Sequence, residues 1–379
     1  MNVVFSVNVP YPLGMAGSMR VRLFAEYLAQ QNHYTSVLVT NSDNGQNQRN
    51  GILNKVKYMN LSHSKIPYIF HLLLYPIRVF ICISKLRKKD ARNILIVYGD
   101  IDFLTMPVII FAKLFKFKVV IDVVEDRTLQ SEVLSFKAKA NLYLSELLMP
   151  ITIKLIDGLV VISSYLKQKF EKIDSKILIK LIPVSAANLL NPPPIVSDNK
   201  DIINLVYCGS FGVKDGLKFL LDAFDQASNK YPHLHLTLVG TPSKKIQKQV
   251  SLANNINVTG YLDDSEYWKK LYSADILCMT RIDSPFANAG FPFKLGEYLA
   301  TGRVVIATDV GDVKNYLVDK RDALIVSPSS AQAIDTAIDY FISNINDMPN
   351  IGVNGFERSK EFFNPSINSK MFETFIEGL

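Results

Sequence analysis

Lys294 and Glu297 are the residues best placed for chemistry, because both stand in an otherwise apolar segment. Pro292 suits a first helical turn and Gly302 suits the end of a helix, so a helix is predicted between them. At helical spacing Lys294, Glu297 and Thr301 share one face. A carboxylate there accepts both hydroxyls of a ribose, and the lysine and the helix N-terminus bind phosphate. The pattern therefore fits a sugar nucleotide, and it equally fits a surface Lys-Glu pair worth roughly 0.2–0.5 kcal/mol.

A glycine-rich turn forms a second candidate. Gly209, Ser210 and Gly212 follow a predicted strand at residues 203–207, and Lys214 comes before the next predicted helix. Glycines let backbone N–H groups approach an anion, and the lysine adds positive charge. Many turns between a strand and a helix carry glycine for backbone reasons alone. Because ligands bind at the carboxyl ends of strands in an open α/β sheet, this turn is predicted to lie beside the Lys-Glu helix.

The N-terminal part carries a further candidate for anion binding. Gly14 and Gly17 follow the first predicted strand, and Ser18 is suited to cap the helix that comes next. Arg20 and Arg22 then fall in the first turn of that helix. Cations at a helix N-terminus oppose the helix dipole, so we expect an anion nearby. Two exposed arginines tolerated at small cost would explain the pattern equally well.

Glu125 and Asp126 belong to a polar cluster with Asp122 and Arg127 after another buried strand. One of these carboxylates is suited to orient an acceptor hydroxyl or to act as a base. Helix capping with a local ion pair explains the cluster nearly as well.

No metal site is predicted. Asp100 and Asp102 form an Asp-x-Asp sequence, but they stand where a strand gives way to a helix, so capping is a sufficient explanation. The five histidines show no spacing typical of metal ligands. The three cysteines are scattered in apolar contexts, as expected of reduced thiols in a cytoplasmic protein. The first residues show no export leader, which also favours the cytoplasm.

The net charge of +7 is unevenly distributed. Residues 1–185 hold 24 Lys and Arg against 13 Asp and Glu, and the rest of the chain is acidic. The basic run 85–92 directly follows the apolar run 66–83. This pairing favours a helix that lies on an anionic membrane, and a core helix with a solvated basic end is the alternative. Interruptions by proline and charge speak against a membrane span, and no motif indicates nucleic-acid binding.

Short apolar runs alternate with helical patterns along the whole chain, which is typical of a doubly wound parallel α/β sheet. The first set of predicted strands comprises residues 3–7, 36–40, 56–59, 94–97, 119–122, 159–162 and 178–182. The second set comprises residues 203–207, 235–239, 257–259, 276–279, 304–306 and 323–326.

Four parts follow from this pattern. Residues 1–185 are predicted to form an acceptor-binding Rossmann-like domain, and residues 202–350 a nucleotide-sugar-binding one. Residues 186–201, rich in proline and polar residues, read as a linker. Residues 351–379 are predicted to be helical and to pack back toward the N-terminal domain.

Four segments together resemble the retaining glycosyltransferases of family 4, which have the GT-B fold. They are residues 207–216 (Tyr-Cys-Gly-Ser-Phe-Gly-Val-Lys-Asp-Gly), 261–275, 291–312 and 157–164. The resemblance covers nearly the whole chain. It implies two Rossmann-like domains facing a central cleft, with Glu297 holding the donor ribose and Lys214 meeting the donor phosphates.

The chain departs from the family pattern at two positions. Ala289 stands where many members have a first glutamate, and Phe211 stands where many have an arginine near the diphosphate. Arg281 or Lys294 is then expected to supply the missing charge. Asn288, or the backbone from Gly290 to Phe291, is expected to contact the sugar.

The resemblance implies transfer of a sugar from a nucleotide diphosphate sugar to a saccharide or lipid-linked acceptor, without a metal or other cofactor. Assembly of bacterial surface polysaccharide, such as lipopolysaccharide, is the setting expected from it. Two alternatives remain at this point. One is a nucleotide-sugar epimerase or hydrolase on the same fold. The other is a noncatalytic nucleotide-sugar-binding subunit, which the missing first glutamate makes plausible.

Overall fold

The computed structural model divides the chain into two units, Met1–Pro183 with Pro365–Leu379, and Val184–Asn364. It describes all residues except 41–46, 62–67, 100–104, 131–135, 187–201 and 251–254. Nearly the whole predicted linker, both aspartates of the Asp-x-Asp sequence, and the beginning of the apolar run 66–83 lie outside the described residues.

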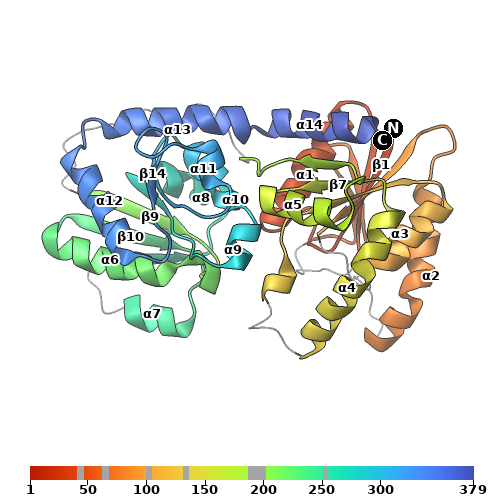
Figure 1. Cartoon of the computed structure of the whole chain (residues 1–379), viewed down its shortest axis with the longest axis horizontal. Helices are drawn as coiled ribbons and strands as arrows, with labels where there is room; N and C mark the ends of the chain where they lie inside the picture. The colour runs from red at the N-terminus through yellow and green to blue at the C-terminus, as the bar shows by residue number, and fades with distance from the viewer. Residues whose placement is uncertain (41–46, 62–67, 100–104, 131–135, 187–201, 251–254) are drawn as a thin grey trace. The chain divides into compact units, whose positions relative to one another are not determined.

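The first unit contains an eight-stranded sheet in the order β3-β4-β2-β1-β5-β6-β7-β8 (Figure 1). Its strands are β1 Asn2–Val7, β2 Tyr34–Val39, β3 Asn50–Leu53, β4 Val56–Asn60, β5 Asn93–Tyr98, β6 Lys118–Val123, β7 Gly158–Val161 and β8 Ile179–Leu181. All seven strands predicted here are present, and all but β3 pair in parallel. The sequence pattern missed β3, which forms an antiparallel hairpin with β4.

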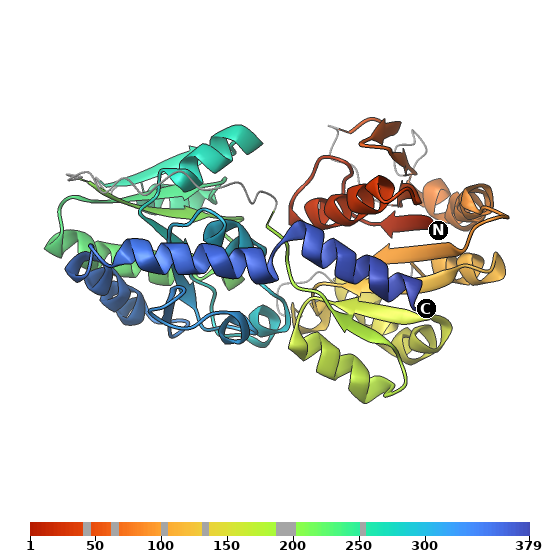
Figure 2. The same ribbon diagram turned by 90° about the horizontal axis from the view of Figure 1, so that it is seen from above.

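Helices cover both faces of this sheet. They are α1 Ala16–Gln30, α2 Tyr68–Leu86, α3 Thr105–Leu114, α4 Phe136–Leu155, α5 Ser164–Ile173 and α14 Pro365–Glu377, with a 3-10 turn at Arg127–Gln130. The C-terminal helix α14 packs against α1 (Figure 2). The ring of Phe372 stacks on that of Phe24 with 4.5 Å between centroids. Phe372 is fully buried, so the last residues of the chain complete the core of the first unit.

An ion pair also fastens α14 to the first unit. Nε2 of His33 lies 2.9 Å from a carboxylate oxygen of Glu373, and Lys370 donates to the other oxygen at 2.8 Å. With Glu377 nearby, His33 and Glu373 form a group whose polar atoms lie within 4.8 Å of one another. Both oxygens of Glu373 already have protein partners, so we assign this group to the anchoring of α14.

The predicted roles of Ser18 and Arg20 are corrected by the structure. Ser18 is not the cap of α1, which begins at Ala16; its hydroxyl donates to the carbonyl of Pro10 at 2.5 Å. The anion that Arg20 meets is the buried carboxylate of Asp122, with nitrogen to oxygen distances of 2.9 and 3.0 Å. Arg20 also donates to the carbonyls of Ile182 and Pro183. Arg20 therefore holds residues 182–183, where the first segment of this unit ends, next to β6.

The second unit contains a six-stranded sheet in the order β11-β10-β9-β12-β13-β14, all parallel. The strands are β9 Ile203–Cys208, β10 Leu234–Val239, β11 Ile256–Gly260, β12 Ile276–Met279, β13 Val304–Thr308 and β14 Leu324–Val326. The helices are α6 Leu217–Lys230, α7 Lys244–Val250, α8 Asp264–Tyr272, α9 Pro285–Ala289, α10 Phe293–Leu299, α11 Val313–Tyr316, α12 Ala331–Ser343 and α13 Met348–Phe362. A 3-10 turn at Val213–Asp215 precedes α6.

The strand order reverses direction between β9 and β12. In doubly wound sheets such a switch point opens a crevice at the carboxyl ends of the two strands, where ligands bind. The predicted α/β fold is thus confirmed in each unit. None of the helices among the described residues is long and apolar enough to cross a membrane.

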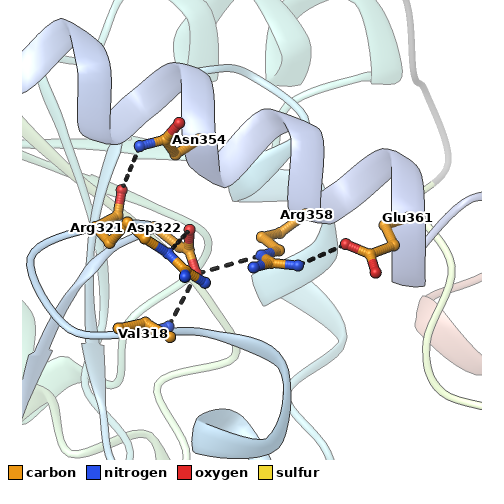
Figure 3. Close-up of polar contacts among 6 residues, drawn as sticks. All are labelled: Val318, Arg321, Asp322, Asn354, Arg358 and Glu361. Atoms are coloured by element: carbon orange, nitrogen blue, oxygen red, sulfur yellow. Dashed lines mark hydrogen bonds and ion pairs between the residues drawn. The ribbon is translucent and has the colours of Figure 1, made fainter.

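Helix α13 is fastened to the loop before β14 through the buried carboxylate of Asp322 (Figure 3). Asp322 accepts hydrogen bonds from Arg321, from the backbone of Val318 and from Arg358 on α13. Burial alone would raise the pKa of Asp322, but the hydrogen bonds from Arg321 and Val318 and the charge of Arg358 hold it below 3.8. Asn354 on α13 also donates to the carbonyl of Arg321.

We expect Asp322→Asn to lower the free energy of unfolding by about 1–2 kcal/mol at neutral pH, because an amide is a weaker acceptor for two guanidinium groups. A lowered carboxyl pKa contributes stability above its unfolded value, and this contribution disappears as pH falls from 3.8 through the folded pKa. Urea unfolding at several pH values would measure both effects. A variant with the same acid sensitivity as the wild type would contradict this role.

Candidate functional site

The glycine turn after β9 is held in shape by the buried side chain of Asp215. One oxygen of this carboxylate accepts from the backbone N–H of Gly212 and from the hydroxyl of Ser210, both at 3.1 Å. The N–H of Gly209 donates to Val239 at the end of β10, which anchors the beginning of the turn. The turn is therefore fixed by partners within the protein, and an added Cβ at Gly212 would meet only Asp215 and Ser210, both at 3.6 Å.

Gly216 ends this segment with a left-handed backbone, φ +64°. A Cβ atom here would overlap the carbonyl oxygen of Thr280, which lies just after β12. The backbone carbonyl of Lys214 accepts from Ile282 at 3.1 Å, and the Lys214 ammonium lies 4.7 Å from the ring centroid of Phe286. These contacts join the turn after β9 to the loop after β12, so both segments stand at the switch point of the sheet.

Helix α10 carries Lys294 and Glu297 and is shorter than predicted. It covers Phe293–Leu299, with Pro292 as the residue before it. Lys294 and Glu297 are partly exposed while Leu295 is buried, which confirms the predicted division into a polar and an apolar face. Thr301 does not belong to the polar face, because it lies beyond the helix, is fully buried and donates to the carbonyl of Tyr298.

Tyr298 on the buried face connects α10 to the last residue of β9. Its hydroxyl accepts from the N–H of Cys208 at 2.9 Å and donates to the carbonyl of the same residue at 3.3 Å. The side chain is fully buried. Helix α10 is thereby positioned at the carboxyl end of β9, where the glycine turn begins.

Glu297 accepts a hydrogen bond from the hydroxyl of Tyr267 on α8, with 2.7 Å between the oxygens. Burial raises the pKa of Glu297, and the Tyr267 hydrogen bond and the charge of Lys294 partly offset this effect. Burial also raises the pKa of Tyr267, as does Glu297, so this hydroxyl keeps its proton and donates. Only one oxygen of Glu297 is used in this bond, and a carboxylate has capacity for further donors.

Lys294 on α10 lies close to the end of β9 and the start of the glycine turn. Its ammonium lies 5.2 Å from the ring centroid of Tyr207 and close to the backbone of Gly209, where an added Cβ would approach it to 2.7 Å. Burial lowers the pKa of Lys294, Asp215 opposes this shift, and Arg281 adds to it through its positive charge. Arg281, Lys294 and the glycine turn therefore lie near one another, and burial leaves the Lys294 ammonium poorly hydrated, which favours its pairing with an anion.

Asn288 lies in the short helix α9 and is partly exposed, whereas Phe291, just before α10, is buried. Asn288 donates to Asp283 at 2.9 Å and accepts from the N–H of Gly311 at 3.2 Å. Gly290 is buried, and the Phe291 ring is a core residue that packs on Tyr316 at 5.3 Å, so its side chain is not a donor contact. Ala289 is also fully buried.

The remaining predicted residues lie in the first unit. Asp126 accepts from Lys169 at 2.6 Å and from Thr128, which makes it part of an ion pair. Glu125 is partly exposed. Arg22 lies near Glu26 within α1. A Cβ at Gly17 would come within 2.8 Å of the Tyr98 hydroxyl at the end of β5, and Gly14 lies against Ser18.

Three residues of the site were missed by the sequence analysis. Asp215, Tyr267 and Tyr298 act through hydrogen bonds to groups that are 3, 30 and 90 positions away in the chain. The only available signal was the presence of each inside a segment that resembles the glycosyltransferases.

Tyr267→Phe is expected to weaken donor binding by about threefold to tenfold, because one neutral-to-charged hydrogen bond that orients Glu297 is lost. The titration of Glu297 should move to higher pH, since this hydrogen bond lowers its pKa. Calorimetric titration with donor nucleotide over a pH series would measure both. Tyr261→Phe is the matched control, because Tyr261 is 84% exposed. Equal losses in the two variants would rule out a positioning role for Tyr267.

Comparisons with known proteins agree with this geometry. Residues 203–344 match the family model described as "Glycosyl transferases group 1". No curated protein matches the sequence. Among solved structures, sucrose-phosphate synthase from Thermosynechococcus elongatus superimposes with a TM-score of 0.80 at 18% identity, covering 100% of this chain and 99% of that chain.

Two further structures are similar over nearly the whole length. HepE from Anabaena, in complex with UDP and glucose, has a TM-score of 0.74 at 14% identity and covers 100% of both chains. A glycosyltransferase from Rickettsia africae has a TM-score of 0.68 at 20% identity, covering 99% of this chain and 98% of that one. These similarities show the GT-B fold. Together with the family match over residues 203–344, they support a transferase.

Proposed function

We propose that this protein is a retaining glycosyltransferase of family 4 that moves a sugar from a nucleotide diphosphate sugar to a saccharide or lipid-linked acceptor. The observation that carries the proposal is the convergence of Lys214, Lys294 and Glu297 at the switch point between β9 and β12. Cations beside a glycine turn suit a diphosphate, and Glu297, three residues after Lys294 on α10, suits a ribose.

The chemistry asked of these residues is mainly electrostatic. When the bond between sugar and phosphate breaks, negative charge grows on the leaving diphosphate. Lys214, Lys294 and Arg281, with the backbone N–H groups of the glycine turn, would stabilise that charge. Preorganised charges are effective because they need little rearrangement during the reaction, and the hydrogen bonds of Asp215 hold the turn in place. We propose that this reaction needs no metal.

A uridine diphosphate sugar is the donor that the comparisons favour, because HepE binds UDP and UDP-glucose. Glu125 is the carboxylate that we propose for orienting the acceptor hydroxyl, because it is partly exposed whereas Asp126 is buried. The setting that we propose is synthesis of bacterial surface polysaccharide in the cytoplasm, with peripheral attachment to the inner face of the cell membrane.

Thermal unfolding with UDP, GDP, ADP and CMP nucleotides and their sugars tests the donor site. A ligand that binds the folded protein raises its stability by mass action. We expect a selective rise with one nucleotide base, and loss of that rise in Lys214→Ala. Lys218→Ala is the control, because this lysine is exposed on α6. No stabilisation by any nucleotide would contradict the proposal.

A noncatalytic nucleotide-sugar-binding subunit is the second candidate, and Ala289 is the observation that favours it. Alanine replaces the first glutamate of the resembled family, and its side chain is fully buried. Product analysis with the stabilising donor separates the candidates. Sugar transfer to an acceptor supports the transferase, whereas binding without turnover supports the subunit. Turnover without an acceptor would indicate an epimerase or hydrolase.

A further inference from the structure

Helix α2 presents apolar side chains to solvent. Leu74, Ile77 and Ile81 recur at a spacing of three and four residues and therefore form one stripe along the helix. They are 41%, 57% and 43% exposed. The opposite side of α2 is buried through Val79 and Ile83, so the exposed stripe is additional to the core-facing one.

The two neighbouring helices show the same feature. On α3, Ile110 and Leu114 are exposed at a spacing of four residues. On α4, Tyr143, Leu147 and Ile151 continue at spacings of four, and Tyr143 and Leu147 are 74% and 64% exposed. Consecutive helices with outward apolar stripes are unusual, because large exposed apolar patches normally mark an interaction site.

All three stripes lie on one face of the first unit. The strands β4, β5, β6 and β7 are connected by α2, α3 and α4, and β5, β6 and β7 follow one another across the sheet. Right-handed crossovers in one direction place their helices on the same side of a sheet. Figures 1 and 2 show the three helices side by side, and Phe80 on α2 packs edge-on against Phe111 on α3. We call the outward side of α2, α3 and α4 the α2–α4 face.

Basic residues border this face. On α4, Lys139 and Lys154 stand at the two ends of the stripe from Tyr143 to Ile151, and both are exposed. On α2, the exposed Lys85 continues the stripe four residues after Ile81. The three helices carry six Lys and Arg residues and a single acidic residue, Glu146. The face is thus apolar in the middle and positive at its edges.

Helices α5 and α6 differ from this pattern. The exposed side of α5 carries Lys167 and Glu171, which lie 3.7 Å apart, and its apolar Tyr165 and Ile173 are 38% and 39% exposed. In the second unit, α6 exposes Lys218 and Asp225 and buries its apolar residues. Neither helix carries an apolar stripe like those of α2, α3 and α4.

We propose that the α2–α4 face docks on an anionic lipid surface, with the apolar stripes at the level of the headgroups and the lysines against lipid phosphates. This inference rests on the proposed function, in which the acceptor is lipid-linked, and identifies the part of the fold that meets the membrane. A broad, nearly continuous surface of three parallel helices fits a planar partner, and its charge pattern fits anionic lipid. The helices lie on the bilayer and do not cross it.

Sedimentation with vesicles tests the inference on the full chain. Vesicles of phosphatidylcholine with phosphatidylglycerol should bind the protein, and vesicles of phosphatidylcholine alone should bind it at least about tenfold more weakly. Lys139→Glu with Lys154→Glu should reduce binding to the anionic vesicles by about tenfold or more. Leu147→Ser with Ile151→Ser should also reduce it, and added salt should not restore the loss. Lys218→Glu, a charge reversal on α6, is the matched control and should bind like the wild type.

Circular dichroism of the same variants shows that each is folded, and stabilisation by donor nucleotide reports separately on the second unit. Retained nucleotide stabilisation without vesicle binding by the wild type would overturn the membrane inference and leave the proposed function standing. Vesicle binding without any nucleotide response would do the opposite. Light scattering gives a third outcome. Self-association lost in Leu147→Ser with Ile151→Ser, without vesicle binding, would overturn the inference in favour of a protein interface.

Discussion

Gly216→Ala is expected to lower the free energy of unfolding of the second unit by about 3 kcal/mol or more. Two costs add at this position. The backbone angle of +64° is strained for an L-residue by about 1–2 kcal/mol. The new methyl group would also overlap the Thr280 carbonyl oxygen, and overpacking against the backbone costs about 1–3 kcal/mol. Denaturation by urea, followed by circular dichroism, would measure the loss.

Gly260→Ala separates the two costs. Gly260 also has a left-handed backbone, φ +75°, but an added Cβ there meets nothing within 4 Å. It should therefore show the conformational cost alone, about 1–2 kcal/mol. Gly212 has an ordinary φ of −68°, and an added Cβ there makes only ordinary contacts at 3.6 Å, so the stability of Gly212→Ala should stay within about 0.5 kcal/mol of the wild type. If Gly216→Ala lowered the free energy of unfolding no more than Gly260→Ala does, the close contact between Gly216 and the Thr280 carbonyl would be refuted.

Glu297→Ala should weaken donor binding by about 100-fold. A carboxylate that accepts from ribose hydroxyls makes charge-assisted hydrogen bonds of about 1.5–3 kcal/mol, and each 1.4 kcal/mol corresponds to about tenfold in affinity. Calorimetric titration of the donor nucleotide measures the change. A deoxyribose analogue provides the control, because it should bind the wild type weakly but lose little further affinity in Glu297→Ala. If Glu297→Ala weakened binding of the deoxyribose analogue by the same factor of about 100, Glu297 would not contact the ribose.

The same interaction makes donor binding depend on pH. Burial raises the pKa of Glu297, so this carboxylate becomes protonated at a higher pH than an ordinary glutamate, and affinity should decline as the solution becomes mildly acidic. Burial lowers the pKa of Lys294, so its positive charge should be lost below the usual 10.5 as pH rises. Glu297→Gln should abolish the acid-side decline only. An unchanged acid-side decline in this variant would assign it to another group.

The regular part of the fold was predictable because periodicity is a local property. Every predicted strand is present, since buried parallel strands are short continuous apolar runs bounded by turns. The strand β3 was missed because its exposed positions, such as Ile52, give it no such run. Helix α10 is shorter than predicted because it ends at Leu299. Thr301 follows the helix, and its hydroxyl donates to the carbonyl of Tyr298, so Thr301 is buried without belonging to the helix.

The charged residues of the site were predictable only where spacing within one helix sets them together, as for Lys294 and Glu297. The role of Arg20 depended on Asp122, which is 102 positions away and reaches it only through the order of the strands. Tyr267 was missed for the same reason.

The hydroxyl of Tyr298 makes the hydrogen bonds to Cys208 that a neighbouring strand would otherwise make. Strand β9 pairs with β12 only at Leu205 and Val206, so the peptide groups of Cys208 extend beyond that ladder. A single phenol satisfies both of them. This contact fixes α10, which carries Lys294 and Glu297, relative to the start of the glycine turn. Gly209 and Lys294 are 85 positions apart in the chain. Because the site is already ordered, binding of a donor would carry only a small free-energy cost for ordering the protein.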